Sequence, residues 1–176
     1  MIHGLLEDEV TAVLEIDPGK FVLGHNRGLT FWDGNKFLKM PFTGEDGAEL
    51  PFTRVLDLKA DSKQNIWVLA ERVGVARINK QKEIKWYGSR QGLPENIKIL
   101  SVGIDHTDNV WVGTSRGIFF MASKKNRFVS IPVDKFPIQA VRKTYITTKK
   151  VLYLGSSVNG VYVYEIKKNQ WKINRS

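Results

Sequence analysis

Polar and apolar residues alternate along this chain in short runs, and the runs recur four times. Each copy has an aromatic residue followed by small or apolar residues, a polar turn, a glycine and a second alternating run. The aromatic residues of the four copies are Phe21, Trp67, Trp111 and Tyr153, at spacings of 46, 44 and 42 residues. Alternation with a period of two residues is typical of β-strands. We therefore expect an all-β chain.

The length of the repeat predicts the architecture. Each copy contains four short apolar runs; the first of these are residues 10–16, 55–58, 99–104 and 140–146. A repeat of this length with four strands is typical of a β-propeller, in which each repeat forms one four-stranded blade. We predict a single blade array over residues 1–176 that is part of a larger propeller or an incomplete one. The expected blades are residues 5–52, 53–97, 98–138 and 139–176.

Composition and charge narrow the classes of function. The chain of 176 residues has no cysteine, which excludes disulfides and thiolate chemistry within it. The first residues lack the pattern of a signal peptide, and no segment approaches the length of a membrane helix. The net charge is +9, with 12 Lys+Arg and 13 Asp+Glu in residues 1–88 but 15 and 5 in residues 89–176. The basic half indicates either an anionic partner or lysines in turns and on edge strands.

The third copy carries the most specific pattern. It contains the tripeptide Gly92-Leu93-Pro94, an apolar strand that ends at Asp105, the run Trp111-Val112-Gly113-Thr114, and the pair Gly117-Ile118. This succession resembles the repeat of the two-component regulator propeller family. The other copies depart from it in part. The first lacks a preceding Gly-Leu-Pro, the second has Leu-Ala in place of Gly-Thr, and the fourth has tyrosine in place of tryptophan.

The resemblance implies a function in signalling. Propellers of that family form the extracytoplasmic part of hybrid two-component sensors, which detect oligosaccharides and signal to a histidine kinase. We therefore expect a ligand-sensing propeller segment that binds an oligosaccharide or other small ligand, periplasmic or otherwise extracytoplasmic in its parent receptor. The family's sensors have more blades, a β-sandwich, a membrane helix and a kinase. Further expected partners are the remaining blades or a second copy, through open edge strands, and a membrane only through another part of the parent.

Candidate ligand-binding residues lie where the links between blades and the turns between second and third strands share one face. Arginine side chains suit carboxylates, sulfates and sugar hydroxyls, and aromatic rings stack on sugars. The alternatives are that the arginines bridge neighbouring blades or simply solvate a tight turn, and that the aromatic residues pack between blades. The candidates are His25, Asn26, Arg27, Arg72, Trp86, Tyr87, Arg90, Arg116 and Asn159.

Catalysis has little support in the sequence. The histidines at 3, 25 and 106 lie far apart and lack the spacing of a metal pair, and no phosphate loop or nucleophile elbow is present. The acidic turn from Asp105 to Asn109 resembles a calcium loop but lacks the EF-hand layout. We expect no enzyme, no metal and no cofactor. The alternative functions are a protein-interaction scaffold and, more weakly, binding of nucleic acid or an acidic polymer through the basic half.

Overall fold

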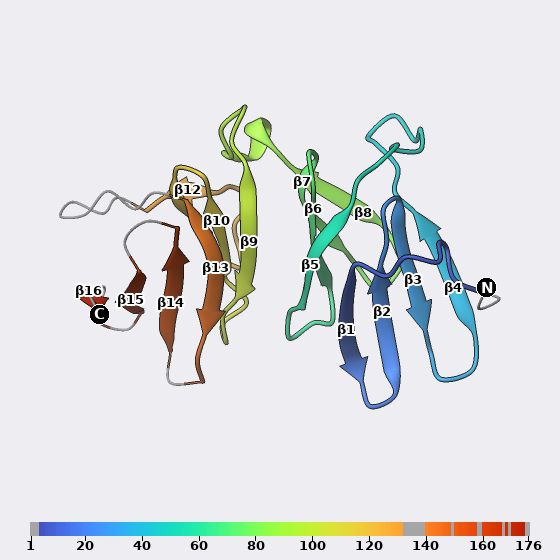
Figure 1. Ribbon diagram of the computed structural model, residues 1–176, viewed down its shortest axis with the longest axis horizontal. Helices are drawn as coiled ribbons and strands as arrows, with labels where there is room; N and C mark the ends of the chain where they lie inside the picture. Colours follow the sequence, from blue (N-terminus) through green and yellow to red (C-terminus); the bar gives the residue numbers. More distant parts are fainter. Residues whose placement is uncertain are drawn as a thin grey trace. The chain divides into compact units, whose positions relative to one another are not determined.

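The computed structural model describes residues 4–131, 140–148, 150–157, 160–166, 168 and 170–174. Within these residues, sixteen strands form four antiparallel sheets of four strands, and each sheet follows the order of the chain (Figure 1). The all-β prediction is therefore confirmed. We call the sheets blades 1 to 4. Their strands are β1–β4 (Ala12–Asp17, Lys20–Gly24, Gly28–Trp32, Phe37–Pro41), β5–β8 (Val55–Ala60, Ile66–Ala70, Gly74–Ile78, Ile84–Tyr87), β9–β12 (Ile99–Ile104, Val110–Thr114, Gly117–Met121, Val129–Ser130) and β13–β16 (Val141–Ile146, Val151–Ser156, Val161–Glu165, Gln170–Asn174).

The chain divides into two compact units, Met1–Trp86 and Tyr87–Ser176, and each has its own core. In unit 1, buried Val22 and Phe31 of blade 1 belong to one cluster with Val55 and Val68 of blade 2. In unit 2, Trp111 of blade 3 joins buried residues of blade 4, including Leu152, Leu154 and Tyr162. Burying such a side chain contributes about 1.5–3 kcal/mol, so packing between sheet faces stabilises each pair of blades.

Glycines in the second strands allow this close packing. A Cβ atom built on Gly24 would lie 2.5 Å from Cγ1 of Val55, and one on Gly113 would lie 2.7 Å from Cγ1 of Val141. In both units, therefore, the first residue of the next blade's innermost strand lies directly against a backbone position that only glycine fits.

Strand pairing corrects one feature of the repeat pattern. Trp111 pairs with Phe120, three residues after the glycine that opens its partner strand. In blade 1 the residue with that pairing is Val22, opposite Phe31, whereas Phe21 pairs with Trp32. The spacing argument that aligned Phe21 with Trp111 is therefore wrong by one residue. Val22 is fully buried in the core, and Phe21 is only partly buried on the opposite face.

The turn between the first two strands of blade 3 is held by one carboxylate. Asp105, 3% exposed, accepts hydrogen bonds from the backbone N–H groups of Thr107 and Asn109, from both of their side chains, and from Nε1 of Trp111 at 3.0 Å. Burial raises the pKa of Asp105, but these hydrogen bonds outweigh burial and hold that pKa below its ordinary value. The carboxylate of Asp105, in the acidic turn that resembles a calcium loop, therefore accepts hydrogen bonds from groups of the protein.

Blade 2 repeats this arrangement. Asp61 accepts hydrogen bonds from the backbone and side chain of Asn65 and from Nε1 of Trp67 at 3.1 Å.

Across the described part of the chain, no helix has the length and apolar character of a membrane span.

Candidate functional site

Each blade is closed by a contact between its link and its own second turn. Backbone N–H groups of Glu71, Ser115 and Ser157 donate to the carbonyl oxygens of Arg54, Lys98 and Ala140, at 2.8, 2.8 and 3.2 Å. In each pair the acceptor precedes the donor by 17 residues. The contact brings the link and the turn between second and third strands to the same end of each blade, which we call the turn face.

In blade 1 a histidine side chain makes the equivalent contact. The first link, residues 4–10, crosses blade 1 before β1, where Gly4 lies against Phe37 and the Leu6 N–H donates to Oγ1 of Thr30 at 2.9 Å (Figure 1). His25 Nδ1 lies 2.7 Å from the Glu9 carbonyl oxygen, and Nε2 lies 2.9 Å from Thr30 Oγ1. A carbonyl oxygen only accepts, so Nδ1 carries the proton, and the Thr30 hydroxyl donates to Nε2.

His25 has no exposed surface. Both of its ring nitrogens are used within the protein, so this side chain fastens the first link to blade 1. Its placement next to Asn26 and Arg27 nevertheless brings three of the predicted site residues together on one turn.

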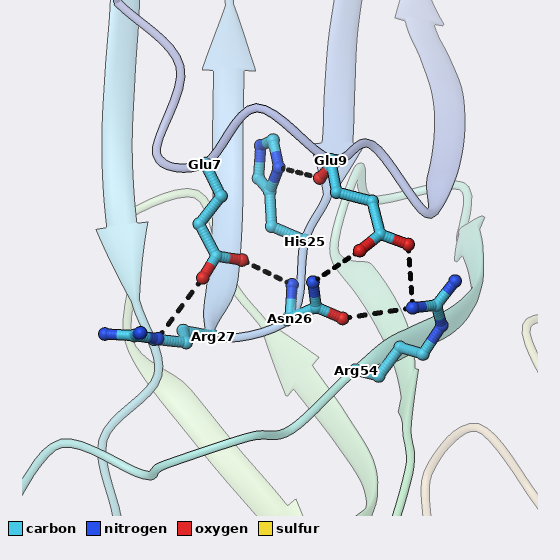
Figure 2. Close-up of polar contacts among 6 residues, drawn as sticks. All are labelled: Glu7, Glu9, His25, Asn26, Arg27 and Arg54. Atoms are coloured by element: carbon cyan, nitrogen blue, oxygen red, sulfur yellow. Dashed lines mark hydrogen bonds and ion pairs between the residues drawn. The ribbon is translucent and has the colours of Figure 1, made fainter.

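Around that turn, the carboxylates of two glutamates in the first link form hydrogen bonds and ion pairs with amide and guanidinium groups (Figure 2). Glu7 accepts from the Asn26 N–H at 2.6 Å and pairs with Arg27 Nε at 3.2 Å. Glu9 accepts from Asn26 Nδ2 at 3.0 Å and pairs with Arg54 Nη1 at 2.8 Å. Arg54 Nη1 also donates to Asn26 Oδ1 at 3.2 Å.

These contacts form one charged network at the surface of unit 1. The hydrogen bond from Asn26, and then the guanidinium of Arg54, lower the pKa of Glu9. The Arg27 side chain is 62% exposed and that of Arg54 is 44% exposed, whereas the Glu7 side chain is only 22% exposed. The network therefore presents the guanidinium groups and the Glu9 carboxylate, which is 54% exposed, to solvent and keeps Glu7 beneath them.

A pocket of about 310 Å³ lies beside the network. One wall belongs to the link between blades 1 and 2. In this link the backbone of Glu49 forms a β-bridge with that of Thr43, and the Leu50 N–H donates to the Phe42 carbonyl at 2.8 Å. Fully buried Phe42 anchors this link. The residues that line the pocket are Leu6, Glu7, Arg27, Pro41, Glu49 and Leu50.

Two aromatic candidates support the blades. Trp86 is partly buried, lies edge-on to Phe42 with ring centroids 5.5 Å apart, and donates from Nε1 to the Thr43 carbonyl at 2.8 Å. In unit 2, Tyr87 is 1% exposed and lies edge-on to Phe128 at 5.8 Å. These contacts match the alternative interpretation, in which both rings pack within the protein.

The remaining candidates are spread over the two units. In unit 1, Arg72 is exposed on the turn of blade 2, next to the Glu71 that contacts Arg54. In unit 2, Arg90 is exposed in the short 3-10 helix η1 (Ser89–Gln91), and Arg116 is exposed on the turn of blade 3. Asn159 lies outside the described residues. The assignment of these residues to a binding site stays a prediction.

Sequence reasoning missed Glu7, Glu9, Arg54 and the pocket. A signal for the first link was present, because Gly4-Leu5 precedes the first strand of blade 1 much as Gly92-Leu93 precedes that of blade 3. Gly4 lies against Phe37 in the last strand of blade 1, and Gly92 lies against Phe128 beside the last strand of blade 3. Blade 1 therefore has a link of the Gly-Leu type, although its third residue is not proline.

Metal ligands are not grouped here. In the residues that the structure describes, no group of three or more His, Asp or Glu side chains could hold a metal ion. The groups at the turn face of unit 1 are carboxylates, an amide and guanidinium groups, which form hydrogen bonds and ion pairs.

No protein-family model and no curated protein sequence matches the chain. Several solved structures match its fold. The extracellular domain of BT3049 from B. thetaiotaomicron, described as a hybrid two-component system, matches with a TM-score of 0.73 and 17% identity, over 96% of this chain and 25% of that domain. The extracellular domain of BT4673 from the same organism, also described as a hybrid two-component system, gives 0.70 and 17%, over 92% and 22%.

An enzyme shares the same fold. Virginiamycin B lyase from Staphylococcus aureus matches with a TM-score of 0.77 and 13% identity, over 98% of this chain and 58% of the lyase. The chain thus spans about a quarter of the length of the two extracellular domains and little more than half of the lyase. Its blades are β-propeller blades, and the likeness to the two extracellular domains is consistent with the resemblance of its repeats to the two-component regulator propeller family.

Proposed function

We propose that this chain is the ligand-sensing propeller segment of a two-component signalling receptor, and that it binds an oligosaccharide or other small ligand at the turn face of unit 1. The repeat pattern and the fold shared with extracellular domains of two-component systems support this proposal. By the same likeness, the segment lies outside the cytoplasm in its parent.

The observation that carries the proposal is the charged network of Glu7, Glu9, Asn26, Arg27 and Arg54 next to the pocket. Sugar hydroxyls both donate and accept hydrogen bonds, so a sugar site needs acceptors and donors at fixed positions within one surface. The carboxylates supply acceptors, and the amide and guanidinium groups supply donors. Their mutual contacts hold them in place before a ligand arrives, which reduces the entropic cost of binding.

We also propose that the chain binds its ligand without chemical conversion. The lyase shows that the fold can host an enzyme. The histidine at the turn face, His25, has no exposed surface and binds two groups of the protein, so a ligand at the turn face does not reach its ring.

Calorimetric titration of the folded chain with a panel of neutral, amine-bearing and acidic oligosaccharides tests the proposal. We expect heat of binding with at least one class, and a loss of about tenfold or more in affinity for Arg54→Ala. Lys63→Ala is the matched control, because it removes an exposed cation in the turn at the opposite end of blade 2. Absence of heat with the whole panel, or an equal loss with Lys63→Ala, contradicts the proposal.

A protein-interaction scaffold is the second candidate function, and one surface of unit 2 favours it. Tyr145 and Tyr153 pair across β13 and β14 and are 69% and 39% exposed, and Val161 on β15 is 40% exposed. Apolar side chains gathered on one sheet face are typical of a surface that binds protein. If this candidate function is right, sedimentation analysis should show self-association of the chain, and Tyr145→Lys should abolish it.

A further inference from the structure

The pocket beside the charged network has one apolar side. Leu6, Pro41 and Leu50 contribute this wall. Leu6 is held by its backbone bond to Thr30, and Pro41 ends β4, whose backbone lies so close to Gly28 that no larger residue fits there. A wall of aliphatic side chains suits the C–H face of a sugar ring. The volume of about 310 Å³ lies at the small end of ligand pockets, which span roughly 300–1,000 Å³, so the pocket suits a small sugar or one end of a longer chain.

The charges of the residues that line the pocket do not cancel. Glu7 and Arg27 pair with each other at 3.2 Å, and the second carboxylate oxygen of Glu7 accepts from the Asn26 N–H. Glu49 is exposed at the rim, and its carboxylate makes no hydrogen bond or ion pair with any residue that the structure describes. The pocket therefore carries a net charge of about −1, located on Glu49.

This sign is opposite to that of the chain as a whole. The net charge of +9 arises in the second half, whereas the pocket belongs to unit 1, which has 12 Lys+Arg and 13 Asp+Glu. An unpaired carboxylate beside a pocket attracts a cationic group and repels an anionic one. The Nε of Arg27 pairs with Glu7, and because this side chain is 62% exposed its guanidinium is open to hydroxyl oxygens of a ligand.

We propose that the pocket takes an amine-bearing sugar, with the ammonium group at Glu49, hydroxyls at Arg27 and Glu7, and the C–H face on Leu6, Pro41 and Leu50. This inference rests on the proposed function and names the class of its ligand. An exposed ion pair of this kind changes affinity by about two- to fivefold.

Calorimetric titration with three disaccharides tests the inference: the dimer of glucosamine, its N-acetylated form, and the dimer of galacturonic acid. At low ionic strength and near-neutral pH, we expect the amine-bearing dimer to bind about two- to fivefold more tightly than the N-acetylated one, and the acidic dimer to bind most weakly. Glu49→Gln removes this preference. Glu71→Gln, which removes an exposed carboxylate on the same turn face but outside the pocket, leaves the preference intact.

The outcomes separate the two proposals. If the N-acetylated or the acidic dimer binds at least as tightly as the amine-bearing one, the inference is wrong, while the proposed function stands. If Glu71→Gln removes the preference as fully as Glu49→Gln does, the preference arises from the general field of the turn face, and the pocket assignment is wrong. If no saccharide binds to folded protein, both fail.

Discussion

The two ends of the blades are built in different ways. At one end, Asp61 and Asp105 make the same hydrogen bonds to an asparagine and a tryptophan, once in each unit. At the turn face, blades 2, 3 and 4 share only the backbone contact between link and turn, whereas blade 1 makes that contact through His25 and adds a network of carboxylates and guanidinium groups. Repetition at one end indicates a structural requirement common to blades 2 and 3. Variation at the other end is what a binding surface requires.

At the turn face, blade 1 differs from blade 3. In blade 3 the Ser115 N–H donates to the Lys98 carbonyl, and Arg116 beside it is exposed. In blade 1 the side chain of His25 reaches the Glu9 carbonyl, and Arg27 pairs with Glu7. The same backbone plan thus carries two different surfaces, which locates the candidate site in blade 1.

The largest effect should follow removal of the repeated carboxylate. Asp105→Ala leaves Trp111 Nε1 and the donors of Thr107 and Asn109 without their acceptor. Because Asp105 and Trp111 are both buried, we expect a loss of roughly 3 kcal/mol in the free energy of unfolding. Urea unfolding followed by tryptophan fluorescence measures it. Asp105→Asn keeps part of the accepting capacity and should cost less.

Asp61→Ala provides the matched test in unit 1. It removes the same acceptor from a less buried turn, so its cost should be smaller than that of Asp105→Ala. A negligible cost at both positions would contradict the structural role given to this end of the blades.

The next effect compares two glycines at the same position of successive blades in unit 2. Gly113 pairs with Ile118 and Gly155 pairs with Val161. A Cβ atom on Gly113 would lie 2.7 Å from Val141, whereas the nearest atom to one on Gly155 is 3.7 Å away. We expect Gly113→Ala to cost about 1–3 kcal/mol by overpacking and Gly155→Ala to cost less than about 0.5 kcal/mol. Thermal unfolding checks both, and equal costs would show that packing is not the cause.

The sequence predicted the strands well because each is short, alternating and bounded by turn residues. It failed where the turns differ in length. Phe21 lies seven residues before Gly28, as Trp67 does before Gly74, but the turn of blade 1 is one residue shorter. Equal spacing therefore placed Phe21 one position out of register, and the side-chain period of two turned it to the opposite face.

The candidate site was less accessible to sequence reasoning. Arg27 and Asn26 were found because the turn is a local feature, marked by the following glycine. The carboxylates of Glu7 and Glu9 reach that turn from a link that lies 19 and 17 residues before Asn26 along the chain, and Arg54 reaches it from the next link. Such contacts depend on how the links pack across the blades, which hydrophobic periodicity does not encode.

The smallest effect should come from the exposed part of the network. Glu9→Gln removes the ion pair with Arg54 but keeps the carbonyl oxygen that His25 binds, so the melting temperature should fall by only about 1–2 °C. The pKa of Glu9 is lower in the folded protein than in the unfolded chain, so its contribution is fully present above the unfolded pKa and is lost as the pH falls through the folded pKa. The difference in melting temperature between variant and wild type should therefore be present at neutral pH and vanish in acid. A difference that persists in acid would mean that Glu9 stabilises the protein through side-chain packing and not through its charge.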